Sequence, residues 1–337
     1  MKISVVIPVY NAYKHLPKLL ETLTNQTHQD LEIILVDNNS KDQSAAYIKE
    51  YAKKDSRVIF LTETQQGPNF ARKTGFLKAT GTYIYFCDAD DFVEADALEK
   101  MLTAARKEKA DVVIGNYQEL DETGTVKKAC KGVFFPDPTG NLKRYPELIL
   151  VKPALWNKLF RRSVISEDTF ITSKIGEDMV ITLLAFAKAK KVIYIDEVIY
   201  DYIPAETGLT NSIQPRNLLD IIVTCQTLET LLTKIDRQQL YGETLPFLMF
   251  THVLYRILRS ELIKEEMVRR DVYQKLHGYL STIEYRHNPY YKKKIHYRLA
   301  NAVLATKALY HCVLVRAFIR FFLTNRTLYR IFKLLDH

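Results

Sequence analysis

The sequence of 337 residues predicts an α/β domain with a mainly parallel sheet, followed by a region built from helices. Up to about residue 210, apolar runs rich in β-branched residues alternate with segments of helical spacing, which is typical of a sheet covered by helices on both faces. From Pro215 onward the apolar residues keep a helical period, and no strand signal is strong. Charge divides the chain at the same place, because residues 1–210 carry a net charge of −1 and residues 211–337 carry +10.

Six apolar runs predict the strands, since they are rich in Val, Ile and aromatic residues and are bounded by polar or turn residues. They cover residues 2–10, 31–37, 57–63, 81–91, 111–120 and 191–203. Helical spacing predicts helices over residues 14–25, 38–54, 69–79, 96–110 and 176–189. Glycines and prolines between residues 120 and 150 predict a loop and a hairpin, which the segment WNKLFRRSVI follows.

Ligands of open parallel sheets bind at the carboxyl ends of the strands. Asp37 ends the second predicted strand, and Asp88 lies at the end of the fourth. We therefore expect a ligand site near these two carboxylates.

Composition gives the broad class of protein. An apolar content of 47% and a charged content of 26% are those of an ordinary globular protein. The opening MKISVVIPVYN does not fit a secretory signal, because Pro8 and Asn11 interrupt its apolar run. No run of about 18 uncharged apolar residues predicts a membrane-spanning helix. The four cysteines form no CxxC pair, so we expect reduced thiols, no zinc site and a cytoplasmic protein.

The stretch FCDADDF places three carboxylates, Asp88, Asp90 and Asp91, in four positions after an apolar strand. In a turn after a strand their oxygens can converge, and oxygen ligands suit Mg²⁺ or Mn²⁺. Such an ion commonly binds through one or two carboxylates together with substrate phosphates. The alternative is an exposed acidic turn that favours the start of the next helix.

Three further patterns have both a functional and a structural interpretation. Asp37, in VDNNSKD, either accepts a hydrogen bond from a nucleotide base or caps the next helix. Arg72 and Lys73, in FARKTG, either meet a phosphate or belong to an exposed basic face. Glu177 and Asp178, in GED, either complement the helix dipole or supply a carboxylate base.

In this order, the elements resemble the family-2 inverting glycosyltransferases of the GT-A fold. The motifs that carry the resemblance lie between residue 3 and about residue 210, and they are SVVIPVYN, ILVDNNSKD, GPNFARKTGFLKATG, YIYFCDADD, WNKLF and GED. The resemblance implies metal-dependent transfer of a sugar from a nucleotide donor, usually a UDP-sugar, with inversion at the anomeric carbon. The remainder of the chain lies outside it.

The resemblance also implies roles for individual residues. The implied nucleotide-sugar-binding residues are Pro8, Val9, Tyr10, Asp37, Asn39, Arg72, Asp88 and Ala89. Asp37 would bind the uracil ring, and Arg72 would approach the phosphates or the sugar of the donor. Asp90, together with Asp88, would hold Mn²⁺ or Mg²⁺ as cofactor.

On the acceptor side, the resemblance implies that Asp178 is the general base, with Glu177 beside it. Trp156, Asn157 and Lys158 would line the acceptor side. An alcohol is a poor nucleophile at neutral pH, so a carboxylate must take its proton as the new bond forms.

Two positions depart from the family pattern. Lys73 stands where many members have Asn after the Ala-Arg pair. Ile203 stands where many members have Arg, so a diphosphate contact from that loop would have to come from Thr210, Asn211 or Ser212.

The basic carboxy-terminal region allows two interpretations. Residues 313–337 place Arg316 and Arg320, and Arg326 and Arg330, four positions apart among apolar residues. This amphipathic basic pattern can lie on an anionic membrane surface through residues 288–337. Alternatively, its apolar face packs within a helical domain, on the catalytic domain or on another subunit as a homo-oligomer. No nucleic-acid-binding motif accompanies the charge, so no nucleic-acid partner is expected.

Together, these observations predict a GT-A catalytic domain over residues 1–212 and a basic helical domain over residues 213–337. Within the first, residues 1–115 bind the nucleotide-sugar and residues 116–212 form the acceptor side. The predicted protein is a cytoplasmic transferase, or one bound peripherally to the inner face of the plasma membrane, with a glycan, glycolipid or glycoprotein acceptor. A nucleotidyltransferase that makes sugar nucleotides is a weaker alternative, because VYNAYKHL lacks the glycine-rich phosphate loop. A non-catalytic subunit of a glycan-assembly complex is disfavoured by the intact DAD and GED motifs.

Overall fold

The fold is described from a computed structural model. The structure describes residues 1–121, 123–133, 140–141, 144, 146–173, 175–204, 214–236 and 244–284. The chain separates into two compact units. The first contains residues 1–172 and 177–206, and the second contains residues 173–176 and those from 207 onward.

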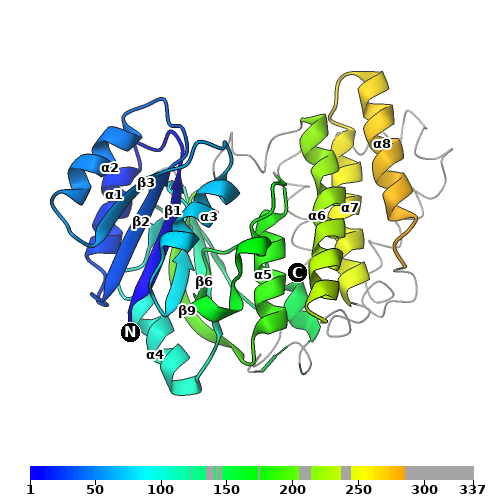
Figure 1. Cartoon of the computed structure of the whole chain (residues 1–337). Coiled ribbons are helices and arrows are strands. Elements are labelled where there is room, and N and C mark those ends of the chain that lie inside the picture. The colour runs from blue at the N-terminus through cyan, green and yellow to red at the C-terminus, as the bar shows by residue number, and fades with distance from the viewer. Residues whose placement is uncertain are drawn as a thin grey trace. The chain divides into compact units, whose positions relative to one another are not determined.

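The first unit is built around one mixed sheet (Figure 1). Its strands are β1 (Ile3–Val9), β2 (Leu31–Asp37), β3 (Val58–Thr62), β4 (Tyr83–Phe86), β5 (Phe92–Val93), β6 (Val112–Leu120), β7 (Val126–Cys130), β8 (Lys158–Arg161) and β9 (Val192–Tyr202). They are arranged in the order β3-β2-β1-β4-β8-β6-β9-β5, and β7 pairs with β6. Strands β1 to β4 are parallel, as are β6 and β9, so these carboxyl ends point toward one edge of the sheet.

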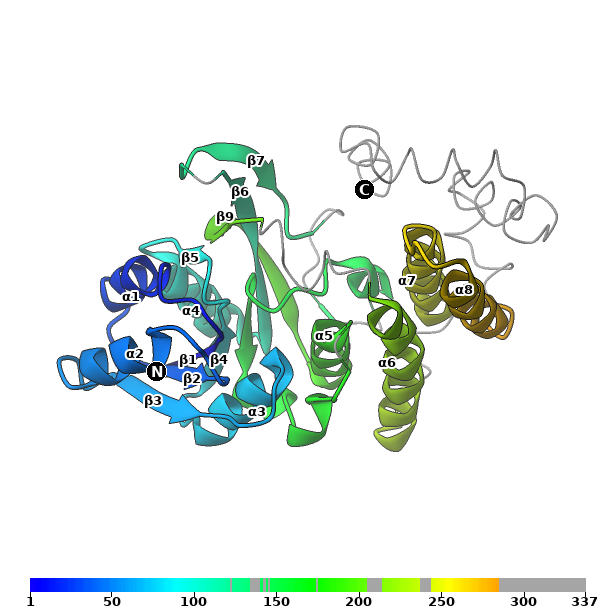
Figure 2. The ribbon, with the colours of Figure 1, turned by 90° about the horizontal axis from the view of Figure 1, so that it is seen from above.

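Helices cover both faces of this sheet, as the alternating strand pattern predicted. They are α1 (Leu16–Thr24), α2 (Ser44–Ala52), α3 (Pro68–Lys78), α4 (Ala97–Glu108) and α5 (Glu177–Lys188). Figure 2 shows α1 and α4 on one face and α3 and α5 on the other. Alternation along β1 explains this arrangement, since Val5 and Ile7 pack in the cluster with α1 and α4, whereas Val6 faces α3.

The predicted fold class is confirmed, and β8 is an additional strand. Residues 158–161 form β8, which runs antiparallel between β4 and β6, although no strand was predicted there. The hairpin expected between residues 120 and 150 is formed by β6 and β7. Short 3-10 turns occur at Pro146–Leu150, Arg162–Val164 and Glu167–Thr169.

Helix α3 lies close to the sheet because of its glycines. Gly67 precedes the helix with a φ of 143°, a conformation that favours glycine, and Pro68 then begins the first turn. A Cβ atom on Gly75 would lie 2.5 Å from Cγ1 of Val6, so only glycine permits this approach. The approach sets the distance from the sheet of every other side chain on α3.

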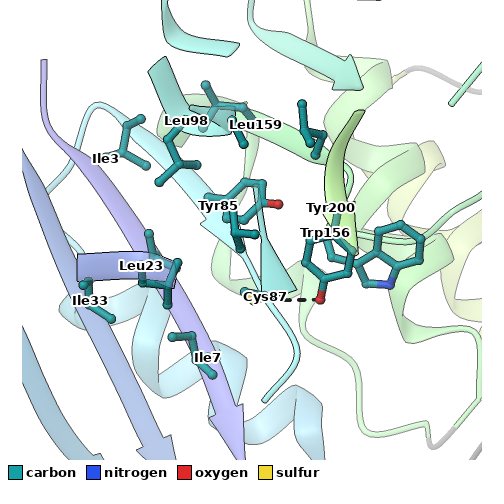
Figure 3. Packing of buried hydrophobic residues seen from close by; sticks show 14 of the residues in the cluster. Ile3, Ile7, Leu23, Ile33, Tyr85, Cys87, Leu98, Trp156, Leu159 and Tyr200 are labelled. Atoms are coloured by element: carbon teal, nitrogen blue, oxygen red, sulfur yellow. Dashed lines mark hydrogen bonds between the residues drawn. The ribbon is translucent and has the colours of Figure 1, made fainter. Parts of the chain in front are cut away.

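The apolar core of the first unit contains the inner residues of the strands and of α1, α2 and α4. It extends to the aromatic side chains Tyr85, Trp156 and Tyr200, which Figure 3 shows in one cluster with Cys87. Cys87, Cys130 and Cys225 are free buried thiols, which agrees with the predicted reduced state for the three cysteines described.

The second unit contains three helices in its described residues, α6 (Pro215–Lys234), α7 (Thr244–Ser260) and α8 (Glu266–Leu280), which pack on one another. They confirm the helical periodicity seen after Pro215. Within the described residues, no helix combines the length and apolarity needed to cross a membrane. The basic segment 288–337 lies outside the described residues, as do Thr210, Asn211 and Ser212.

Candidate active site

The loops that follow β1 and β2 are tied together at the carboxyl edge of the sheet. The backbone N–H of Asn11 donates to Ser40 Oγ over 3.0 Å, and the N–H of Lys41 donates to Asn11 Oδ1 over 2.7 Å. Asn11 has a φ of 50°, and Asn39 in the second loop has a φ of 64°, a region that Asn tolerates better than most residues. The two loops therefore form one fixed rim, from which Tyr10 projects with 52% of its surface exposed.

Asp37 and Val9 lie side by side beneath this rim, because they are paired at the ends of β2 and β1. Asp37 is buried, and its Oδ1 atom has no hydrogen-bond partner among the described residues. A buried acceptor without a partner costs free energy, so a ligand that donates an N–H to it would bind favourably. Pro8, one residue earlier in β1, pairs with Val36 and supports the same edge.

The two asparagines after Asp37 hold the next loop. Asn38 donates from Nδ2 to the carbonyl oxygens of Glu63 and Gln65, over 3.0 and 2.6 Å. Asn39 donates to the carbonyl oxygen of Thr64 over 2.6 Å. One N–H of the Asn39 amide is therefore engaged by protein, which leaves its second N–H and its carbonyl oxygen for a ligand.

The three carboxylates after β4 have three different environments. Asp88 is 31% exposed at its side chain and accepts a hydrogen bond from Arg72. Asp91 is 1% exposed and accepts from the hydroxyl of Tyr200 and the N–H of Ile203. Asp90 lies between them and forms no ion pair with any basic side chain that the structure describes. Buried Ala89 completes the turn.

Asp88 and Asp90 have the chemistry of a divalent-cation site. Burial, and then the charge of Asp88, raise the pKa of Asp90 above its ordinary value. A carboxylate whose charged form is disfavoured in this way would be relieved by a hard cation with oxygen ligands. The described residues contain no group of three or more His, Cys, Asp or Glu side chains placed to hold a metal ion.

Arg72 is the central cation of the site. Its side chain is 6% exposed, and it reaches two carboxylates that are far apart in sequence (Asp88 and Asp178). Nη2 lies 2.9 Å from Oδ1 of Asp88, and Nη1 lies 3.0 Å from Oδ1 of Asp178. Nη1 is also 3.5 Å from Oε1 of Glu177. Burial alone would lower the pKa of Arg72, but the charges of these carboxylates raise it.

Glu177 and Asp178 occupy the first turn of α5, where the helix dipole favours negative charge. The side chain of Asp178 is 28% exposed, twice the 14% of Glu177. Burial raises the pKa of Asp178, and Arg72 opposes that shift. Burial and the charge of Asp178 raise the pKa of Glu177 to about 7. Asp178 is thus the more accessible carboxylate and the one that Arg72 holds more closely.

Trp156 forms part of a stack of aromatic rings beside this cluster. Its ring is parallel to that of Tyr200 at 4.7 Å and to that of Tyr202 at 5.5 Å. Tyr117 meets it edge-on at 4.8 Å. The ammonium group of Lys152 lies over Tyr117, Trp156 and Tyr202, at 4.3, 4.7 and 5.1 Å from the ring centroids.

Asn157 and Lys158, expected to line the acceptor side, are fully buried. The Nζ atom of Lys158 donates to the carbonyl oxygens of Lys152 and Ala154 and to Oδ1 of Asn157, over 2.6 to 2.7 Å. Burial lowers the pKa of Lys158, and these three acceptors use each hydrogen of its ammonium form. Both side chains therefore fix the loop that carries Trp156.

The two positions that depart from the family pattern have structural partners. Lys73 forms an ion pair with Glu167 at 2.9 Å, outside the Arg72 cluster. Ile203 donates its backbone N–H to Asp91 over 2.7 Å. Neither side chain takes part in the cluster of carboxylates around Arg72.

Sequence analysis missed Tyr200, Tyr202 and Lys152. The signal that could have indicated the tyrosines is the pair of aromatic residues in YDY at the end of the last strand, with one residue between them. Lys152 carried no such signal, because its ring partners come from three different segments.

The family model and the curated relatives that match this chain are named as glycosyltransferases. The family model described as "Glycosyl transferase family 2" matches residues 4–168. Glycosyltransferase GlyG of Streptococcus pneumoniae serotype 4 is 30% identical over 217 residues, which are 59% of this chain and 70% of that protein. The poly(ribitol-phosphate) beta-glucosyltransferase of Bacillus spizizenii is 33% identical over 215 residues, which are 62% of this chain and 33% of that protein.

Solved structures agree on the fold. Residues 1–349 of S. aureus TarS, in complex with UDP-GlcNAc, align with a TM-score of 0.60 at 18% identity, over 85% of this chain and 93% of that one. The chain spans 30%, 62% and 33% of the length of three curated relatives, so it corresponds to a part of each.

Proposed function

Because this chain belongs to the family-2 glycosyltransferases, we propose that it moves a sugar from a UDP-sugar to a hydroxyl group of a cell-surface glycan or a glycosylated protein, with inversion. The observation that carries the proposal is the contact of one buried guanidinium, Arg72, with Asp88 on the donor side and with Asp178 on α5. Asp88, proposed to act near the leaving group, and Asp178, proposed to accept the proton, are thereby held around the guanidinium of Arg72.

The donor half of the proposal is supported by the rim above β1 and β2. Asp37 offers a buried oxygen without a partner, and a uracil ring would donate its N–H there. Tyr10 is exposed and can cover the base or the ribose. A nucleotide held in this way would direct its diphosphate toward the turn of Asp88 and Asp90.

We propose Asp90 and Asp88 as the residues that hold Mg²⁺ or Mn²⁺. When bound, such an ion stabilises the charge that develops on the departing diphosphate. The same two carboxylates would otherwise repel the phosphates, so the donor and the cation should bind together. Arg72 adds a fixed positive charge beside Asp88.

The proton-accepting half is assigned to Asp178. Its partial exposure lets an acceptor hydroxyl approach, while Arg72 keeps the carboxylate oriented and favours its charged form. Trp156 is proposed to form an inner wall of the acceptor side, since the residue is 5% exposed and its ring stacks on Tyr200 and Tyr202. In this proposal Asn157 and Lys158 support that wall from beneath.

A surface glycan is proposed as acceptor because one relative is named for transfer to poly(ribitol-phosphate), a polymer with hydroxyl groups. The role of residues 213–337 in acceptor, membrane or oligomer contact, and the cytoplasmic location, stay predictions.

The proposal is tested with UDP-glucose, UDP-galactose, UDP-GlcNAc and UDP-GalNAc, and with GDP-mannose as a donor with a different base. Each is incubated with the protein in Mg²⁺, in Mn²⁺ and in EDTA, and binding heat and UDP release are measured. At least one UDP-sugar should bind and release UDP slowly in a metal-dependent manner, and GDP-mannose should not.

Two variants separate the halves of the site. Asp90→Ala should lose metal-dependent donor binding. Asp178→Asn should keep donor binding and lower the rate of UDP release by about 10²- to 10⁴-fold, which is the usual contribution of a general base. Asp96→Asn removes a nearby carboxylate that is 47% exposed and pairs with Lys100, so it should behave like the wild type. Failure of every nucleotide sugar to bind would contradict the proposed function.

A further inference from the structure

Tyr200 connects two parts of the proposed site that are separate in sequence. The residue is fully buried near the end of β9. Its hydroxyl donates to Oδ2 of Asp91 over 2.9 Å and accepts the backbone N–H of Asp88 over 3.1 Å. One side-chain oxygen thereby bridges the first and last residues of the acidic turn.

Asp91 is engaged at both of its oxygens. Oδ2 accepts from Tyr200, and Oδ1 accepts from the N–H of Ile203 over 2.7 Å. With 1% of its surface exposed, Asp91 could reach a bound cation only by giving up these bonds. The third carboxylate of the turn is therefore an anchor, and it leaves Asp88 and Asp90 to face the donor.

The ring of Tyr200 has a second contact on the acceptor side. It stacks on Trp156 with an interplanar angle of 9° and a centroid distance of 4.7 Å. Figure 3 shows Tyr200 between Cys87, which precedes the acidic turn, and Trp156. Because both ends of this side chain are held, a displacement of the turn would also move the ring that stacks on the indole.

We propose that Tyr200 is a positioning residue that couples the donor-binding turn of Asp88–Asp91 to the acceptor wall formed by Trp156. The proposal rests on the proposed function, which assigns the turn to the donor and Trp156 to the acceptor. It differs from simple core packing, since a phenylalanine would fill the same space and keep the stack. Only the hydroxyl performs the coupling.

The chain offers a matched control in Tyr202. Its ring also stacks on Trp156, at 5.5 Å and 12°. Unlike the Tyr200 hydroxyl, the Tyr202 hydroxyl forms no hydrogen bond with the residues that the structure describes. Tyr200→Phe and Tyr202→Phe therefore remove the same atom from two rings that pack on the same tryptophan, and only the first change breaks a link to the turn.

The first measurement is the affinity for UDP at a fixed Mg²⁺ concentration below saturation, by isothermal titration calorimetry. Mutation of a residue that orients metal-binding carboxylates typically lowers metal affinity by about 10- to 100-fold. Because UDP is proposed to bind together with the metal ion, Tyr200→Phe should weaken UDP binding by a factor in that range. Tyr202→Phe should stay close to the wild type. Equal affinities for Tyr200→Phe and the wild type would overturn the proposal.

The second measurement uses the fact that Trp156 is the one tryptophan of the chain. Its fluorescence is recorded with and without saturating Mg²⁺ and UDP. The emission should change on binding in the wild type and in Tyr202→Phe, and the change should be lost in saturated Tyr200→Phe. A wild-type emission that does not respond to bound UDP would contradict the coupling.

A third measurement needs no donor. Hydrogen exchange of the amides in residues 88–91 should be about tenfold faster or more in Tyr200→Phe, because the N–H of Asp88 and the anchor of Asp91 are released. If the wild type bound no nucleotide, the proposed function would fail, and exchange alone would decide this inference. Unchanged exchange would overturn it.

Asp91→Asn serves where Tyr200→Phe fails to fold. Asparagine keeps the volume but has one side-chain oxygen, so it cannot accept from Tyr200 and Ile203 on two separate oxygens as Asp91 does. It should show the same faster exchange and weaker UDP binding, whereas wild-type behaviour in both would overturn the proposal. If both variants fold, their combined effect should be less than the product of the two, since they break one connection.

Discussion

Arg72 and Asp178 form a hydrogen-bonded ion pair in which Nη1 lies 3.0 Å from Oδ1, although 105 residues separate them in the chain. The guanidinium is almost fully buried, whereas the carboxylate retains 28% exposure. This asymmetry matters for a base, because a cation on its buried side favours the ionised form without blocking its open side.

Replacement of Arg72 by Gln should raise the pKa of Asp178 and of Glu177, since the positive charge that lowers both is lost. A base must be deprotonated to act, so the acidic limb of the pH–rate profile should move to higher pH. The loss of kcat/KM should be about 10²-fold or more near neutral pH and smaller in alkali. The measurement is UDP release as a function of pH, with donor KM determined at each point.

Lys73→Gln is the control for this change. It removes the neighbouring cation, which pairs with Glu167 outside the cluster. Its pH profile should superimpose on that of the wild type. A profile for Arg72→Gln with the wild-type acidic limb, and only a higher donor KM, would limit Arg72 to donor binding.

Glu177 should make stability depend on pH near neutrality. Its pKa is raised to about 7 in the folded protein, from an ordinary value of 4.5. Between these values the folded state binds more protons than the unfolded state, so the free energy of unfolding should fall as pH rises. Glu177→Gln should flatten this slope, measured by urea unfolding at intervals across that window.

Glu21→Gln is the matched control, because Glu21 is 61% exposed on α1. It should retain the wild-type slope. A slope in Glu177→Gln equal to that of the wild type would place the responsible proton elsewhere.

The first unit was predictable from sequence because its signals are local. A buried strand such as β2 is indicated by its own residues, LEIILVD. A carboxylate at its end is then expected at the carboxyl edge of the parallel sheet, where ligands bind. The acidic turn and the first turn of α5 were identified for the same reason. Each is a short motif whose meaning depends on the element beside it.

The contacts between these motifs could not be predicted. β8 is a four-residue strand without a period of its own, and it exists because β4 and β6 both pair with it. Lys158 was expected to line the acceptor side, yet it is enclosed by the loop that it supports. Tyr200 looked like one aromatic among 21 tyrosines, and its role appears only where β9 passes the acidic turn.

Glu32 should stabilise the opposite edge of the sheet. This carboxylate is 7% exposed, pairs in register with Ser4, and accepts hydrogen bonds from the Ser4 hydroxyl and the N–H groups of Thr80 and Gly81. Burial acts to raise its pKa, but these bonds lower the pKa below 4.5. The stabilisation is therefore present above about pH 4.5 and is lost as pH falls through the folded-state value.

Glu32→Gln should lower the free energy of unfolding at neutral pH by about 1–3 kcal/mol, because an amide cannot accept all of these bonds. The difference from the wild type should shrink as pH falls below 4.5. Chemical unfolding at neutral and acidic pH measures both. Glu50→Gln, at an exposed position of α2, should leave stability within about 0.5 kcal/mol.

Gly75→Ala tests how closely α3 must approach the sheet. Alanine favours a helix over glycine by about 1 kcal/mol, so propensity alone predicts stabilisation. Its Cβ atom would, however, lie 2.5 Å from Cγ1 of Val6 and 3.3 Å from Cγ2 of Val36. Both valines are fully buried in strands and cannot move aside, so overpacking should win and destabilise by about 1–3 kcal/mol.

The same substitution should reduce activity, because Arg72 is one turn before Gly75 on α3 and would move away from Asp178. Val6→Ala removes the clashing methyl groups, so the double variant Val6→Ala/Gly75→Ala should be more stable than the sum of the single changes allows. Leu77→Ala, on the exposed side of α3, should change stability by less than about 0.5 kcal/mol. If the changes in the free energy of unfolding simply add in the double variant, the close approach of α3 to β1 does not limit the position of Arg72.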